Sequence, residues 1–378
     1  MQTKKLTQSI ALIATLFWIS CQSADAQIKL DVGGYMQNWV IANQSTDVLT
    51  PSQGNLAILG SKTNKTQGFR IRRARITAKG SIGDKFSTTT WIEFAGSTPS
   101  LLDFHVDAHI RPWFNIRLGQ FMMPGQSFDT SRLVSSKLIF YERAPITTTF
   151  SDRMGYSAFR DVGIMAYGQH GRLWYGVHAS NGSGRFNYAS STITERKAGG
   201  GLYGARVDWE LFDGFTLGSH IATNQQRDVV QSGSEPFDID RTSWSLRAAT
   251  NNLGINGLFS QLEYMSLTGK ENSRGVNLNV DGDYKLHGFY AELGYRITRE
   301  WHLLGRYDEM IQKPGQGGLE QTWNRYGQNN YTFGISRYIY DGNAELVRAH
   351  LNYSFGESGP MDLNNSILVA VFQLRFIP

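Results

Sequence analysis

Residues 102–111 read LDFHVDAHIR and give the clearest indication of the fold. Every even-numbered position in it is apolar and every odd-numbered position is polar. Side chains alternate between the two faces of a β-strand, so this pattern predicts a strand with one wholly apolar face and one wholly polar face.

The same alternation recurs along the chain. It is clear in residues 73–82 and 347–355, and present in 368–376, where Val369 and Val371 blur it. It is weaker but legible in Tyr203–Trp209, Phe215–Thr223, Thr242–Thr250, Ala291–Ile297 and Trp301–Tyr307. Tight turns such as Gly83-Asp84 and Asp341-Gly342-Asn343 alternate with long polar connections. We therefore predict an all-β fold, a transmembrane antiparallel β-barrel of about sixteen strands with short periplasmic turns and long extracellular loops.

A soluble β-sandwich shows the same period of two, but three features favour a barrel in lipid. The N-terminus carries an export signal, aromatic residues such as Trp113, Trp209 and Trp301 stand at strand ends, and no helical segment interrupts the hairpins. In a bilayer, unpaired strand edges cost several kcal/mol for each backbone group, so the sheet must close. A barrel of this size encloses an aqueous lumen.

Residues 1–26 have the form of a cleaved secretory signal peptide. Lys4 and Lys5 precede a short apolar run, and Ala24-Asp25-Ala26 is a small-x-small cleavage site. The alternative is a lipoprotein signal acylated on Cys21. The predicted mature chain is a single outer-membrane barrel over residues 27–378, localised in the Gram-negative cell envelope.

The composition excludes several function classes. Cys21 is the only cysteine, so the mature chain has no disulfide and no cysteine-based metal site. Loss of Lys4, Lys5 and Asp25 lowers the net charge of +5 to +4, which is too small to indicate nucleic acid. The sequence holds no P-loop, dinucleotide fingerprint or Gly-x-Ser-x-Gly motif, so we expect neither an enzyme nor a cofactor.

A basic stripe runs through residues 70–79. If the apolar face of this strand meets lipid, alternation places Arg73, Arg75 and Lys79 in the lumen, because a charge facing lipid at mid-bilayer costs about 2–4 kcal/mol. Anion pores select anions over cations by means of Arg and Lys residues in the lumen. Arg binds phosphate through two parallel hydrogen-bond donors. The alternative is an interior of mixed sign, since Glu93, Asp103 and other acids fit the same register.

The long segment 124–159 follows the fifth predicted strand. Its apolar residues, such as Leu138, Ile139 and Phe140, need a surface to pack on, so we predict a constriction loop that folds into the lumen. An ordinary exposed loop is the alternative. The candidate pore-lining or anion-binding residues of the whole chain are Arg73, Arg75, Lys79, Arg111, Arg117, Arg132, Lys137, Arg143 and Arg160.

The face formed by Asp103, His105, Asp107 and His109 has two interpretations. Alternate strand positions converge on one face, so these side chains could bind a metal or supply acid–base pairs. The simpler interpretation is a polar lumen wall, and we adopt it, with no metal site.

Five short motifs give the sequence a family resemblance. They are GFRIRRAR at 68–75 with Lys79-Gly80, Leu101-Leu102-Asp103 with Asp107-Ala108, RLGQF at 117–121 with Pro124, Ser135-Ser136 with Glu142-Arg143, and FRDVGI at 159–164. In this order and spacing the sequence resembles the phosphate-selective porin O and P family, in a version like those of the Bacteroidetes. The resemblance implies a sixteen-stranded, usually trimeric barrel with an inward loop and a basic lumen that passes anions.

The sequence thus predicts an outer-membrane porin for passive diffusion of small anions, with phosphate as a candidate solute. The expected partners are outer-membrane lipid, small anions and two further copies in a homotrimer, but not nucleic acid. Two alternatives stay open, namely a general porin for neutral or mixed small solutes and a non-conducting barrel with a structural or interaction role.

Overall fold

The computed structural model describes residues 28–43, 68–124, 140–156, 159–184, 193–196, 200–231, 237–251, 254–272, 282–313, 326–342, 344–358 and 363–376. The predicted signal peptide, Arg132 and Lys137 lie outside these residues. The strands are β1 Ile28–Asn43, β2 Gly68–Ile82, β3 Phe86–Glu93, β4 Ser100–Arg111, β5 Phe114–Met122, β6 Arg160–His170, β7 Leu173–Ser180, β8 Ile193–Arg196, β9 Gly201–Phe212, β10 Phe215–Gln231, β11 Phe237–Thr250, β12 Leu258–Asn272, β13 Gly282–Arg296, β14 Trp301–Lys313, β15 Tyr326–Asp341, β16 Ala344–Ser358 and β17 Leu363–Phe376.

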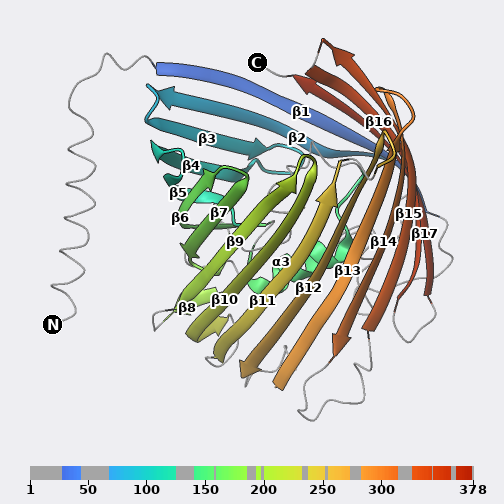
Figure 1. The fold of residues 1–378 in the computed structure, drawn as a ribbon. Coiled ribbons are helices and arrows are strands. Elements are labelled where there is room, and N and C mark those ends of the chain that lie inside the picture. The colour runs from blue at the N-terminus through green and yellow to red at the C-terminus, as the bar shows by residue number, and fades with distance from the viewer. Residues whose placement is uncertain are drawn as a thin grey trace, which may run out of the picture.

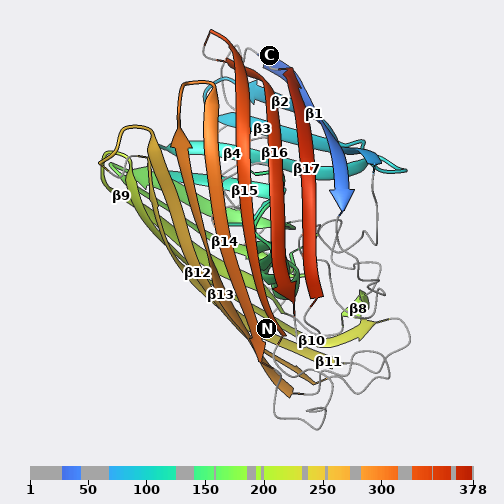
Figure 2. The same cartoon turned by 90° about the vertical axis from the view of Figure 1, so that its right-hand side faces the viewer.

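The strands close into a ring (Figures 1 and 2). Each strand pairs antiparallel with the next along the chain, and β17 pairs with β1 from Gly34↔Phe376 to Asn43↔Ile367. The short β8 lies outside this order, because β7 pairs directly with β9 while β8, as far as the described residues show, pairs with the end of β10. Within the described residues sixteen strands therefore form the barrel, which confirms the predicted fold and strand number.

The two faces of the sheet have opposite chemistry. Large apolar side chains are exposed on the outside, for example Phe104 at 55%, Leu118 at 59% and Phe333 at 55%. Polar and charged side chains are buried on the inside, among them Arg73, Asp107, Asp208, Arg306, Asn352 and Gln373. This inverts the arrangement of a soluble protein and places any functional chemistry inside the ring.

Short connections join the strands at one end of the barrel. Gly83, between β2 and β3, and Gly342, after β15, have φ values of 54° and 57°, which suit glycine in a tight turn. Aromatic side chains gather near these connections, and Trp113, Trp209 and Trp301 are exposed there, as expected of a membrane-interface girdle. No helix among the described residues is long and apolar enough to cross a membrane.

One residue of β4 does not lie on the face that the alternation predicts. Leu102 is only 3% exposed, whereas Phe104 and Val106 are exposed at 55% and 40%. The register between β3 and β4 shifts at Trp91/Ile92, where Trp91 pairs with Asp103 and Ile92 with Leu101. Leu102 is the residue left out of the pairing, and this bulge removes it from the lipid-facing row that simple alternation predicts.

The described part of the connection between β5 and β6 lies within the ring. It includes the helix α3, Pro145–Met154, which contacts β11, β13 and β14 and is seen behind these strands in Figure 1. Phe140, Tyr141 and Ile146 in this segment are at most 2% exposed. We call residues 140–156 the inner segment.

Candidate functional site: the arginine wall of the lumen

A β-bulge on β2 concentrates arginines on the inner face. In the pairing with β1, Gln37 lies opposite Arg73 and Asn38 opposite Ile71, so Arg72 has no partner position. Phe69 and Ile71 face outward before the bulge, and Ile76 faces outward after it. The extra residue therefore lets the adjacent side chains Arg72 and Arg73 both reach the same carboxylate inside the barrel.

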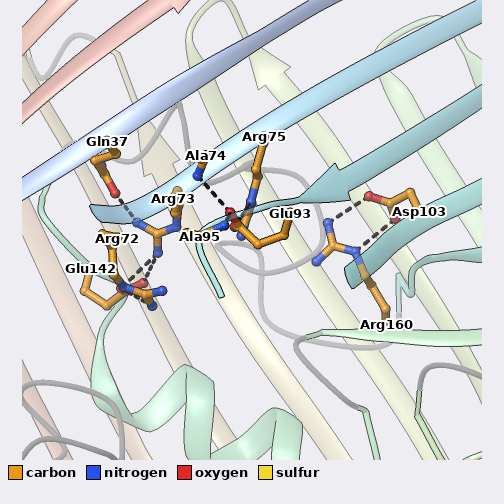
Figure 3. Close-up of polar contacts among 10 residues, drawn as sticks. All are labelled: Gln37, Arg72, Arg73, Ala74, Arg75, Glu93, Ala95, Asp103, Glu142 and Arg160. Carbon is orange, nitrogen blue, oxygen red and sulfur yellow. Dashed lines mark hydrogen bonds and ion pairs between the residues drawn. The ribbon is translucent and has the colours of Figure 1, made fainter. Parts of the chain in front are cut away.

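That carboxylate belongs to Glu142 in the inner segment (Figure 3). Arg72 donates from Nε and Nη2 to Glu142 Oε2 at 3.1 and 2.8 Å. Arg73 donates from Nη2 to Oε1 and Oε2 at 2.6 and 2.8 Å, and its Nη1 donates to the side-chain oxygen of Gln37. Two guanidinium groups thus hold one carboxylate through four charge-assisted hydrogen bonds.

This arrangement fixes the charge of Glu142. Burial alone would raise the pKa of Glu142, but the adjacent Arg72 and Arg73 outweigh burial and hold that pKa well below its usual range. Glu142 is therefore ionised at any physiological pH. With two arginines on one carboxylate, the cluster keeps a net positive charge.

The residues beside Glu142 attach the same stretch to the strands. Tyr141 packs edge-on against Trp39 of β1 with ring centroids 5.4 Å apart. Arg306 of β14 donates from Nη1 to the backbone oxygen of Glu142 at 2.8 Å and lies 4.8 Å from the ring centroid of Phe140. Burial raises the pKa of Tyr141 to about 12, so its hydroxyl stays neutral.

Apolar packing holds the rest of the inner segment. Ile146, Phe150 and Met154 of α3 are at most 1% exposed. They belong to one buried cluster with Met123, which follows β5, and with strand residues from the inner face, namely Phe121, Met165, Leu202, Ala222, Met265, Leu267, Leu286 and Tyr290. The segment is therefore fixed to β9–β13, and also to β5 and β6, independently of Glu142.

Further arginine–carboxylate pairs continue along the wall formed by β2–β6 (Figure 3). Arg75 donates from Nε to Glu93 at 2.6 Å, and the Glu93 carboxylate also accepts from the backbone N–H groups of Ala74 and Ala95. Arg160 forms a bidentate pair with Asp103 at 3.0 and 2.8 Å. We call these groups, with Arg72, Arg73 and Glu142, the arginine wall.

Arg117 and Asp107 complete the arginine wall. Arg117 donates to both oxygens of Asp107, at 2.8 and 3.2 Å, and the hydroxyl of Tyr167 donates to the same carboxylate at 2.8 Å. Arg72 and Arg117 are the most open arginines of the wall, with side chains 29% and 26% exposed, whereas Arg73 and Arg160 are 2% and 4% exposed. Contact with a solute therefore falls first on Arg72 and Arg117.

The remaining predicted residues lie elsewhere. Lys79 is exposed and shares the inner face of β2 with Arg73 and Arg75. Arg111 is exposed at the short-turn end of β4 and donates to the backbone oxygen of Ile110. Arg143 is buried in the inner segment, with its guanidinium 4.6 Å from the ring centroid of Phe159. The structure therefore brings Arg73, Arg75, Arg117 and Arg160 into one wall, while Lys79, Arg111 and Arg143 stand apart from it.

The Asp/His face of β4 belongs to this wall. Asp103 and Asp107 are occupied by Arg160 and Arg117, while His109 is exposed and bonded to Ser87 at 2.9 Å. Across the residues that the structure describes, no group of three His, Cys, Asp or Glu side chains is arranged to hold a metal ion.

Arg72 and Glu142 were not among the predicted site residues, for different reasons. Arg72 is displaced by the bulge, and its signal is visible, because the apolar positions switch from odd numbers at Phe69 and Ile71 to even numbers at Ala74 and Ile76. Glu142 lies 70 residues from Arg72. No local pattern connects a loop carboxylate to its partners at that distance.

Solved structures share this architecture. An anion-selective porin from Comamonas acidovorans superposes with a TM-score of 0.63 at 13% identity, covering 93% of this chain and 100% of that one. The in-vitro folded OmpT of Vibrio cholerae in its trimer form gives 0.62 at 10% identity, covering 93% and 100%. At these identities the likeness concerns the fold alone. None of the curated proteins matches the sequence.

A closed barrel that is apolar outside and polar and charged inside defines a channel of the porin class in the Gram-negative outer membrane. The sequence matches the family of phosphate-selective porins O and P over residues 54–365 of 378. The chain therefore belongs to this family, as its motifs predict.

Proposed function

We propose that the protein lets small anions diffuse passively across the outer membrane, with phosphate as one candidate. The observation that carries this proposal is the placement of Arg72, Arg73 and Arg75 on the inner face of one strand, with Arg72 partly open to the lumen. Cationic side chains along a narrow path raise the local concentration of anions and replace part of their hydration.

A second candidate is a general porin for neutral or mixed solutes. The observation that favours it is the carboxylate partner of each arginine in the wall, since Glu142, Glu93, Asp103 and Asp107 offset much of the positive charge. Within the arginine wall, as far as the structure describes it, only the cluster of Arg72, Arg73 and Glu142 keeps an excess of one positive charge. Anion preference therefore depends on this cluster more than on the rest of the wall.

The test is single-channel recording on the purified, refolded protein in a potassium chloride gradient. Anion passage predicts a reversal potential displaced toward the chloride equilibrium potential, and a phosphate site predicts that added phosphate reduces the chloride current. A reversal potential near zero, with free entry of neutral sugars into vesicles, would support the general porin instead. A barrel without conductance would support a structural role.

Three further properties belong to this proposal. Residues 1–26 are a cleaved export signal, which N-terminal sequencing of the mature protein tests. The segment 124–159 narrows the lumen, in line with the burial of residues 140–156 inside the ring. The protein assembles as a homotrimer, as the trimer form of the Vibrio cholerae relative suggests, and its mass in mild detergent tests this.

A further inference from the structure

The cluster on β2 has the form of an occupied binding site. We propose that Arg72 and Arg73 form an oxyanion-binding site whose resident ligand is the carboxylate of Glu142, a tethered competitor that a permeating carboxylate or phosphate displaces. The inference rests on the proposed passage of anions and specifies the part of the lumen that recognises them.

The geometry of the cluster is that of ligand recognition. Two guanidinium groups converge on one carboxylate and reach both of its oxygens, at 2.6–3.1 Å. Gln37 accepts from Arg73 on the side away from Glu142 and so orients that guanidinium. Any planar or tetrahedral oxyanion that presents two oxygens can use the same donors.

The cluster combines a buried anchor with an open side. The side chain of Arg73 is 2% exposed, that of Glu142 is 13% exposed and that of Arg72 is 29% exposed. A solute in the lumen therefore reaches Arg72 first while Arg73 is held in place. The Arg160–Asp103 pair, at 4% and 9%, has no comparable open side.

Glu142 is also attached differently from the other carboxylate that β2 arginines bind. Glu93 belongs to strand β3 and accepts from two backbone N–H groups besides Arg75. Within the described residues, the Glu142 carboxylate accepts only from Arg72 and Arg73. Its segment is held separately by the apolar cluster around Ile146 and Phe150, so the carboxylate can leave the arginines without the segment unpacking.

A tethered competitor sets the strength of solute binding. A carboxylate carried by the same chain competes with free oxyanions for the donors of Arg72 and Arg73, at an effective concentration set by how its segment is held. The apparent affinity falls by the fraction of time for which the arginines are vacant. Weak binding of this kind suits a channel, because a solute must leave the site as readily as it enters.

The experiment measures how phosphate and acetate, added separately, reduce the chloride current of wild type, Glu142→Gln and Glu142→Asp. Glutamine keeps the volume and removes the charge, whereas aspartate keeps a tethered carboxylate. We expect the half-blocking concentration to fall about tenfold in Glu142→Gln, as vacant arginines bind the solute without competition, and to stay within about threefold of wild type in Glu142→Asp. A fall for phosphate alone assigns the site to tetrahedral anions, and a fall for both assigns it to oxyanions generally.

Glu93→Gln removes the same charge from the lumen without vacating Arg72 and Arg73. An equal fall in Glu93→Gln and Glu142→Gln would mean that the field of the lumen, and not a vacated site, changes binding, and this result would overturn the inference. So would an unchanged half-blocking concentration in Glu142→Gln, provided that the variant shows the heat-dependent gel mobility of a folded barrel.

The wild-type reversal potential separates this inference from the proposed function. Anion bias in wild type with no response to Glu142→Gln refutes the tethered competitor and leaves anion passage standing. Absence of bias in wild type, together with tight phosphate block in Glu142→Gln, refutes passive anion preference and supports the occupied site.

Discussion

The two walls of the lumen hold the same inner segment by opposite means. The arginine wall binds it through Glu142, with charged groups that stay partly open to the lumen. The wall of β9–β13 binds it through α3, with apolar side chains that are almost completely buried and that pack also against Phe121 of β5 and Met165 of β6. Apolar packing is non-directional and excludes water, so it fixes the segment, whereas the open ion pairs are free to exchange partners with a passing solute.

The wall of β9–β13 also carries a group of charged side chains, but these are buried. Asp208 accepts from Arg206 and from Arg247 at 2.9 Å each, and all three side chains are at most 3% exposed. A buried group of this kind is costly to disrupt and has no face for a solute. The exposure of the arginines, more than their number, therefore identifies the solute path.

The largest effect concerns the bulge that builds the arginine wall. Deletion of Arg72 restores regular pairing of β2 with β1 and leaves every other β2 residue on its present face. Deletion of Thr77 shifts the register by one residue, so that either the part of β2 with Arg73 and Arg75 or the part after Thr77 turns its polar side chains toward lipid. Each charge that faces lipid at mid-bilayer costs about 2–4 kcal/mol. We expect the first variant to refold into vesicles and the second to fail, as judged by heat-dependent gel mobility. Equal folding of both would contradict the assigned bulge.

The next effect tests the apolar attachment. Phe150→Ala removes a fully buried ring from the cluster that holds α3, which weakens the packing of the inner segment by about 3–5 kcal/mol. We expect larger current fluctuations and faster trypsin cleavage within residues 140–156. Phe333→Ala, which removes a ring of the same size from the lipid-facing surface, is the control and should leave both unchanged. The same cleavage rate in the two variants would show that α3 is held by something else.

A smaller effect tests exposure as the guide to the solute path. Arg72→Gln removes a charge that is 29% exposed, and Arg247→Gln removes one that is 2% exposed. At an effective dielectric constant of about 20, loss of a nearby charge changes the energy of a passing ion by about 1 kcal/mol, roughly fivefold in the permeability of that ion and in opposite directions for chloride and potassium. We expect this shift toward cations in Arg72→Gln and a smaller one in Arg247→Gln. Equal shifts in the reversal potential would remove the distinction between the walls.

The sequence predicted the barrel well because its signal is repeated in many strands. Alternation at 102–111 places Asp103, His105 and Asp107 inside without any knowledge of their partners, and the short turns set the strand number. Two exceptions, Leu102 and Arg72, sit at bulges, where one extra residue breaks the period of two.

The site was less predictable, because it depends on contacts between distant parts of the chain. The pairing of Arg160 with Asp103 spans 57 residues, and that of Arg72 with Glu142 spans 70. Charge and alternation show that such residues face the lumen, but not which acid neutralises which arginine. Val369 and Val371 interrupt the apolar–polar alternation of β17, and the structure shows that they pack with Trp39 and Tyr141 inside the ring. This contact, too, joins parts of the chain that are distant in sequence.

The smallest effect concerns pH and tests whether Glu142 stays ionised. Its pKa is held well below the usual range because Arg72 and Arg73 outweigh the opposite effect of burial. A carboxyl group whose folded-state pKa is depressed contributes stability above its unfolded-state pKa of about 4.3 and loses it only as the pH falls through the lower, folded-state value. The difference in reversal potential between wild type and Glu142→Gln should therefore be the same at pH 7 and pH 5, since Glu142 is ionised at both. Other titrating groups cancel in this difference. A difference that shrinks between pH 7 and pH 5 would show that Glu142 takes up a proton in this range and that the arginines do not hold it as tightly as their four hydrogen bonds indicate.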